Sequence, residues 1–156
     1  MTWQKWPNPS RLAVEALGRA LNGSQAWEAF TGWDGSGSMP ALSVPVGEKR
    51  PGSVPADGRF IRVLLVAGSD VVPGGFVEAH LIEIEAYAAD PWAAWDLLMA
   101  ARAALWDIQG QTVPSEIGPI QIRRVVETSK PSPLPTGRDG EERFRMGLEI
   151  HLSARG

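Results

Sequence analysis

The residues from Phe76 to Ile108 constrain the fold most, because they combine one long strand pattern with one amphipathic helix pattern. The strand pattern covers residues 76–87, and the helix pattern begins at Asp90 and Pro91. Aspartate can cap the free N–H groups of a helix, and proline at the first helical position loses only a hydrogen bond that it could not make. This stretch therefore predicts a sheet with a long helix lying against it.

The predicted helix carries two apolar stripes when its residues are placed at roughly 100° intervals. The first stripe can cover a sheet and consists of Ala94, Leu97, Leu98, Ala101, Leu105 and Ile108. The second lies about a third of a turn away and is called the tryptophan stripe below. It consists of Trp92, Trp95, Met99, Arg102 and Trp106.

The tryptophan stripe is too large to remain in water on a small monomer, so either a second layer of this chain or another subunit must cover it. Trp, Met and Arg are enriched in the centres of protein–protein interfaces. The stripe is therefore a candidate subunit interface, and the alternative is a wide core-facing surface.

The composition restricts the class of protein. A chain of 156 residues is long enough for one domain with a substantial core. Its hydrophobic content of 44% and charged content of 21% are typical of a globular protein. The net charge of −3 gives no reason to expect a nucleic-acid partner, and no apolar stretch is long enough to predict a membrane partner. The absence of cysteine excludes disulfides, thiolate metal ligands and cysteine nucleophiles.

The first part of the chain predicts one helix and a long irregular region. Residues 1–23 form an N-terminal arm and helix, which begins at Ser10 and ends at Asn22-Gly23. Residues 31–58 are rich in Gly, Pro and Ser, and 42–46 is the best strand candidate among them.

Four strands, a turn and a loop are predicted beyond this region. A strand over 60–67 leads through a turn at 69–75 into the 76–87 strand, whose apolar phase changes and predicts a bulge near Leu81. After the long helix, a third strand contains Ile120, Ile122 and Val126. The proline-rich residues 130–140 predict a long exposed hairpin loop. The last strand alternates, with Phe144, Met146, Leu148, Ile150 and Leu152 facing inwards and Arg143, Arg145, Glu149 and His151 facing outwards.

This order predicts a single α+β domain spanning residues 1–156, with its core in residues 60–152. We expect a mostly antiparallel sheet of about four to five strands, with the N-terminal helix and the long central helix packed against it.

Candidate chemistry is sparse, and we predict no catalytic residue, metal site or cofactor. Asp34, Ser36 and Ser38 resemble the metal-binding Asp-x-Ser-x-Ser signature of von Willebrand factor A domains, but no buried parallel strand precedes them, and a small Gly/Ser loop explains them equally well. His80 with Glu78, and His151 with Glu149, are spaced so that each pair shares a strand face. Such pairs suit metal or acid–base chemistry, and surface ion pairs are the alternative.

From residue 60 onwards the chain resembles a known family in the order of its elements and in the residue patterns within them. The strand pair 59–63 and 80–87 is followed by the helix opening at 89–98, a further strand, a Pro/Gly/Asp-rich loop and a final strand at 143–150. The pattern is similar to that of the tail terminator proteins of long-tailed, non-contractile bacteriophages, the lambda-like group. The resemblance covers most of residues 60–152.

The resemblance implies a non-enzymatic structural role. Tail terminators form a hexameric ring that caps the finished tail tube, stops further tube subunits from adding, and joins the head connector. It therefore implies that the partners are further copies of this chain, the tail tube protein and the head–tail connector protein. The protein would be assembled in the host cytoplasm and lie at the head-proximal end of the tail in the virion.

The resemblance also suggests which residues make contacts. The tryptophan stripe would lie between adjacent subunits of the ring, in a heterologous contact that closes by rotation. The predicted hairpin loop would reach the tube or the connector through Lys130, Leu134, Arg138, Asp139, Glu141 and Arg143.

Two other functions remain open on the sequence. One is another head–tail connector or tail-completion protein, since these share small α+β folds and ring symmetry. The other is a small-molecule or metal-binding α+β domain that uses His80, His151 and nearby carboxylates. A deep pocket lined by those groups would favour this last function.

Overall fold

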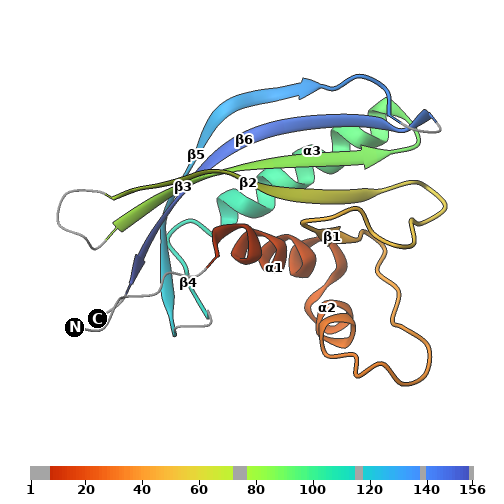
Figure 1. Ribbon diagram of the computed structural model, residues 1–156, viewed down its shortest axis with the longest axis horizontal. Helices are drawn as coiled ribbons and strands as arrows, with labels where there is room; N and C mark the ends of the chain where they lie inside the picture. Colours follow the sequence, from red (N-terminus) through yellow and green to blue (C-terminus); the bar gives the residue numbers. More distant parts are fainter. Residues whose placement is uncertain (1–7, 72–76, 115–117, 138–139, 155–156) are drawn as a thin grey trace.

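The computed structural model describes residues 8–71, 77–114, 118–137 and 140–154. Three helices are formed by Pro9–Asn22 (α1), Ser24–Thr31 (α2) and Pro91–Asp107 (α3). The long strands are Phe60–Val71 (β2), Val77–Ala88 (β3), Ile120–Pro133 (β5) and Glu142–Ala154 (β6). Two short strands, Val46–Gly47 (β1) and Thr112–Val113 (β4), complete the set (Figure 1).

The strands form one six-stranded sheet in the order β1-β2-β3-β6-β5-β4. Every pairing is antiparallel except that of β1 with β2, so the sheet is mixed. The predicted α+β class and the order of the main elements are confirmed. The strand number is higher than expected because the two short strands extend the sheet at its edges.

Both long helices lie on the same face of the sheet, and the long strands curve over them (Figure 1). Helix α1 packs against β2 and α3, and α3 packs against β3 and β6. The core between the layers includes Leu17, Ile61, Ile84, Leu98 and Met146, each fully buried. The first apolar stripe of α3 faces this core as predicted, since Ala94, Leu97, Leu98, Ala101 and Leu105 are buried.

The helix starts show how local sequence sets the boundaries. Asp90 caps α3 as predicted, with its Oδ1 accepting a hydrogen bond of 2.9 Å from the backbone N–H of Ala93. Helix α1 begins at Pro9, one residue before the predicted start, because Asn8 is its cap. The Oδ1 atom of Asn8 accepts a 3.0 Å hydrogen bond from the backbone N–H of Ser10.

The segment after α1 contains the helix α2, which the sequence did not predict. Trp27 of α2 is 2% exposed, and its indole N–H donates to Glu15 of α1 at 2.8 Å. Further along, Asn22 holds the irregular region against α1, because its amide group both donates to the backbone O and accepts from the backbone N–H of Val44 at 2.8 Å. The short β1 falls at Val46–Gly47, at the end of the 42–46 candidate.

The predicted bulge near Leu81 in β3 is wrong. Strand β3 pairs with β6 without interruption from Val77 opposite Ser153 to Ala88 opposite Glu142. The register shifts lie in the pairing of β2 with β3, on either side of the Ala67–Leu81 pair, so the irregularity is near Leu81 but the extra residues are on β2. The alternation between core-facing and outward-facing residues is constant along β3, because buried His80 lies on the core face with Ile82 and Ile84. Strand β2 also extends beyond the predicted 60–67, while residues 72–76 of the predicted turn lie outside the described residues.

The predicted loop over 130–140 is shorter than expected, because β5 continues to Pro133. Ser132 is paired with Arg145, and the backbone N–H of Leu134 donates to the O of Arg143 at 2.9 Å. Strand β4 covers only Gln121 and Ile120 on the other side of β5. The prolines are tolerated because a proline without an N–H can occupy a strand whose outer side has no ladder partner.

Candidate functional site

The tryptophan stripe runs along one flank of α3 as a single row. Its residues alternate in spacing between three and four, which is the spacing of a coiled-coil seam. The side chain of Trp92 is 78% exposed, Trp106 is 42% exposed and Trp95 is 36% exposed. The indole of Trp92 is thus open to solvent in the structure, although the helix already has a complete core face.

The first turn of the stripe is built on Phe144 of β6. The rings of Trp95 and Phe144 meet edge to face, with 5.4 Å between centroids and an interplanar angle of 74°. These two residues line a shallow apolar hollow of about 310 Å³ together with Pro91 and Trp92. Such an arrangement fixes the indole of Trp95 while leaving one of its surfaces free for a partner.

The last turns of the stripe are fixed by Arg102. Its Nη2 donates to Glu127 Oε2 of β5 at 2.7 Å, and its guanidinium lies 4.2 Å from the ring centroid of Trp106. The Nε of Arg102 and the Oε1 of Glu127 are buried without a hydrogen-bond partner among the described residues. Cation–π stacking and the ion pair together hold Trp106 against the flank of the helix. The stripe is therefore preorganised, which reduces the entropy lost when a partner binds.

The predicted contact residues of the β5–β6 hairpin differ in their surroundings. Lys130 is exposed on β5, and Leu134 is half-buried. Glu141 is tied to the irregular region, since its Oε1 accepts from Nη1 of Arg50 at 2.9 Å. Arg143 donates from Nε to the backbone O of Pro135 at 2.9 Å. Arg138 and Asp139 lie outside the described residues.

The two histidine pairs do not come together. His80 is opposite Ile150 on the core face, whereas His151 is opposite Ala79 on the other face of the sheet. His151 Nε2 does lie 2.6 Å from Glu149 Oε1, as the spacing predicted. In the described ranges no three His, Cys, Asp or Glu side chains are grouped so that they could hold a metal ion.

Asp34 forms a local turn. Its Oδ1 accepts hydrogen bonds from Ser36 Oγ at 2.6 Å and from the Ser36 N–H at 2.9 Å. The side-chain and then the backbone hydrogen bond from Ser36 hold the pKa of Asp34 below its ordinary value. These contacts explain the Asp-x-Ser-x-Ser residues as a Gly/Ser loop.

The face of the sheet opposite the helices is largely polar. It carries the ion pairs of Arg62 with Glu85 at 3.7 Å and of Arg145 with Glu83 at 3.5 Å. Tyr87 donates its hydroxyl to Glu85 and stacks on Phe60 with 4.2 Å between ring centroids. Burial of Tyr87, and then the hydrogen bond to the Glu85 carboxylate, raise the pKa of this phenol above its ordinary value.

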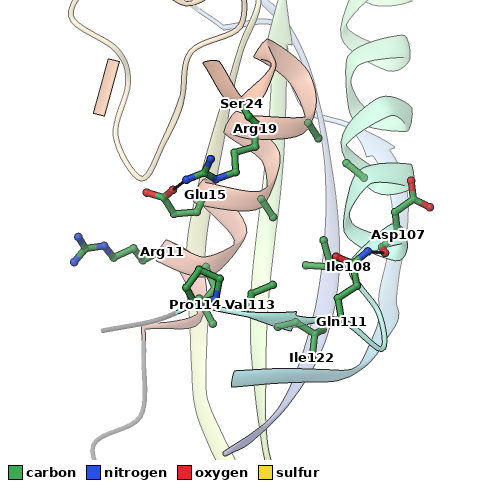
Figure 2. Close-up of a pocket in the computed structure, with 14 residues that line it drawn as sticks. Arg11, Glu15, Arg19, Ser24, Asp107, Ile108, Gln111, Val113, Pro114 and Ile122 are labelled. Carbon is green, nitrogen blue, oxygen red and sulfur yellow. Dashed lines mark hydrogen bonds and ion pairs between the residues drawn. The ribbon is translucent and has the colours of Figure 1, made fainter. Parts of the chain in front are cut away.

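A second surface lies between α1 and the C-terminal end of α3 and is called the α1–α3 groove below (Figure 2). Its volume is about 580 Å³. Apolar residues dominate its lining, namely Leu12, Ala16, Ala20, Ala104, Ile108, Val113 and Ile122. Charged residues lie at its edge, namely Arg11, Glu15, Arg19 and Asp107. His80 and His151 do not line this groove.

Sequence reasoning missed the α1–α3 groove. Its walls come from residues about ninety positions apart, so no local pattern marks it. The sequence predicted only that the N-terminal helix, which contains Ala16 and Ala20, packs against the sheet. The one available signal was their small size: Ala16 and Ala20 sit one helical turn apart on the side of α1 that faces α3.

Part of the β2 edge of the sheet has no neighbouring strand among the described residues. Strand β1 pairs only with Ile61 and Arg62 of β2, and Leu65 and Val66 beyond it are 49% and 53% exposed. Within the described ranges, no helix has the length and apolar character that a membrane span requires. Large apolar side chains are exposed both on β2, at Leu65 and Val66, and on α3, at Trp92, Trp95 and Trp106.

Comparisons with solved structures give matches of low sequence identity. No protein-family model matches the sequence, and no curated protein is similar to it. One solved chain without a descriptive name is 15% identical, with 96% of this chain and 99% of that chain covered and a TM-score of 0.48. A chain from the virion of a native gene transfer agent particle is also 15% identical, with 70% of this chain and 78% of that chain covered and a TM-score of 0.43.

Proposed function

We propose that this protein is a structural subunit of a phage tail, which assembles into a ring that caps the tail tube, ends tube polymerisation and joins the tail to the head connector. The observation that carries the proposal is the tryptophan stripe. Trp92 is 78% exposed on a helix whose core face is already buried, and the stripe is preorganised by Phe144 and Glu127.

The stripe has the chemistry of a permanent contact. Tryptophan and arginine are the residues that dominate binding energy at the centres of interfaces. A monomer that left three indoles partly in water would be prone to association. Repeated pairing between identical subunits would cover them, and a heterologous contact that closes by rotation produces a ring.

The order of elements supports the choice of a tail terminator among ring-forming proteins. Two antiparallel strand pairs flank the long helix, in the order expected from the resemblance. The hairpin formed by β5 and β6 carries exposed Lys130 and a loop braced by Arg50, Glu141 and Arg143. We assign this braced hairpin to the contact with the tube or the connector.

The experiment that tests this function is the solution mass of the purified protein at several concentrations and salt levels, with negative-stain imaging of the largest species. The same protein is then incubated with isolated tail tubes. We expect a six-fold ring, either free or at one end of the tube, and loss of tube elongation when tube subunits are added.

Two results would contradict the proposal. A protein that remains monomeric both in solution and with tube ends does not form the cap. A ring that binds the head connector but leaves tube elongation unchanged is a different head–tail connector or completion protein.

A further inference from the structure

We propose that the α1–α3 groove is the acceptor for the tryptophan stripe of a second copy of this chain, with Trp92 of one subunit seated in the groove of the next. The inference rests on the proposed self-assembly and names the two surfaces that meet. The groove is lined by residues of α1, of the α3 C-terminal end and of β4 and β5.

The two surfaces lie on opposite flanks of α3. Trp95 of the stripe and Ala104 of the groove are nine residues apart, which corresponds to about 180° around the helix at roughly 100° per residue. The stripe borders β5 and β6 through Glu127 and Phe144, whereas the groove borders α1. One subunit can therefore offer its stripe on one side and its groove on the other.

The shapes of the two surfaces are complementary. The groove is a hollow of about 580 Å³ in which Ala16, Ala20 and Ala104 present only methyl groups. Small side chains on two neighbouring helices leave space that an aromatic ring can fill. The stripe supplies that ring, because most of the Trp92 side chain projects into solvent.

The charges near the two surfaces are also complementary. Asp96 lies one turn after Trp92 and is exposed, and Arg11 is exposed at the edge of the groove (Figure 2). Neither side chain forms an ion pair within the described part of the subunit, whereas nearby Arg19 is paired with Glu28 at 2.8 Å. Arg11 and Asp107 lie on opposite sides of the groove (Figure 2), so a seated Trp92 whose Asp96 faces α1 would bring that carboxylate towards Arg11 and away from Asp107. Such an ion pair is available to a second copy and not to an uncharged apolar ligand.

This pairing has a defined symmetry. A contact between two different surfaces of the same chain is heterologous, so a dimer made through it still has one free stripe and one free groove. Further copies then add until the rotation closes. A stripe-to-stripe contact would instead stop at a dimer.

The first test mixes two variants that each lack one surface. Trp92→Glu removes the aromatic donor, and Ala20→Trp fills the groove from an exposed position of α1. We expect each variant alone to be folded by circular dichroism and to lose at least roughly 30-fold in its self-association constant. An equimolar mixture should form a heterodimer, because each variant retains the surface that the other lacks. The matched control Ala29→Trp, on the exposed side of α2, should assemble like the unmodified chain.

Assembly of Ala20→Trp to the same extent as the unmodified chain would overturn the inference while leaving the proposed ring intact. A mixture in which no heterodimer forms would also overturn it, since the two variants would then not carry complementary surfaces. If Ala20→Trp forms rings that no longer bind the tube or the connector, the groove belongs to that partner instead.

The second test uses the absence of cysteine from the chain. Asp96→Cys and Arg11→Cys proteins are mixed, assembled in solution or on tail tubes, and oxidised. We expect a disulfide-linked heterodimer in assembled material, and none when Ala29→Cys replaces Arg11→Cys. Assembled rings without this cross-link would refute the pairing of stripe and groove but leave the proposed ring intact. If the unmodified chain itself does not assemble, the proposed function is refuted.

Discussion

Gly18 of α1 lies directly against the ring of Trp27 of α2. A Cβ atom added there would lie 2.5 Å from Cδ2 of Trp27, which is buried and hydrogen-bonded to Glu15. Glycine to alanine normally stabilises a helix interior by up to about 1 kcal/mol. Here the crowding should dominate, because overpacking a well-filled site costs about 1–3 kcal/mol.

Gly18→Ala is therefore expected to lower the free energy of unfolding by about 1–2 kcal/mol, measured by urea denaturation. The same substitution in a Trp27→Ala background should be neutral or stabilising, because the ring that it meets is gone. A stabilising effect in the unmodified chain would show that α2 does not pack on α1 as described.

Tyr87 is the only tyrosine of the chain, so its ionisation can be followed directly by the absorbance of tyrosinate. Its pKa in the folded state is raised by burial and by the Glu85 carboxylate. The unfolded chain should titrate near the ordinary value of about 10. The neutral phenol therefore contributes stability that is fully present below pH of about 10 and is lost as the pH rises through the folded pKa.

A tyrosinate titration of the native protein should thus lie at higher pH than a titration in denaturant. Glu85→Gln should move the native midpoint downwards, because it removes the acceptor charge but leaves the burial. A native midpoint at or below the denatured one would contradict the packing of Tyr87 against Phe60.

At the scale of elements, the flank of α3 gives the most direct prediction. Trp95→Glu combined with Trp106→Glu should leave a folded protein that no longer self-associates. Each lost tryptophan anchor costs at least about 2 kcal/mol, which corresponds to roughly 30-fold in affinity. Sedimentation and circular dichroism measure the two properties separately.

The matched control is Ala29→Glu combined with Ala41→Glu, which adds the same two charges at exposed positions away from α3. The control should assemble normally. An unfolded Trp95→Glu/Trp106→Glu protein would show instead that the stripe belongs to the core of the subunit.

The outer edge of β5 gives a prediction about solubility. Pro131 and Pro133 lie in the part of β5 beyond the short pairing with β4. Prolines on such an edge prevent further strands from pairing with it. Pro131→Val combined with Pro133→Val should change the free energy of unfolding by less than about 1 kcal/mol but increase aggregation, measured by light scattering. Pro135→Val, which lies beyond the strand, is the control and should remain as soluble as the unmodified chain.

Local patterns predicted the elements whose signals lie within a few residues. The cap at Asp90, the alternation of β6 and the core stripe of α3 were all readable, because helix and strand periodicities are local properties. The predicted end of strand β5 was too early, because the cost of a proline depends on what lies beside the strand. Helix α2 was missed because it is short and is stabilised by packing on Gly18 and Glu15.

For the whole molecule, the sheet separates two different environments. Helices cover one face, and the other carries paired charges such as Arg145 with Glu83. Large apolar side chains are exposed on the flank of α3 and on β2 at Leu65 and Val66, and also at Trp33 and Met39 in the segment after α2. The tryptophan stripe was visible in the sequence, but the α1–α3 groove depends on the tertiary arrangement of α1, α3 and β4 and was not.

The exposure of the tryptophan stripe also gives the molecule an intrinsic optical reporter. Trp92, Trp95 and Trp106 are partly or largely in water, whereas Trp27 is buried whether or not subunits associate. Covering the three indoles of the stripe would shift their fluorescence to shorter wavelengths and protect them from a soluble quencher, whereas Trp33, which is 38% exposed outside the stripe, would contribute a separate signal. The kinetics of association could then be followed in real time without attaching a dye, with Trp92→Phe showing how much of the signal comes from the most exposed ring.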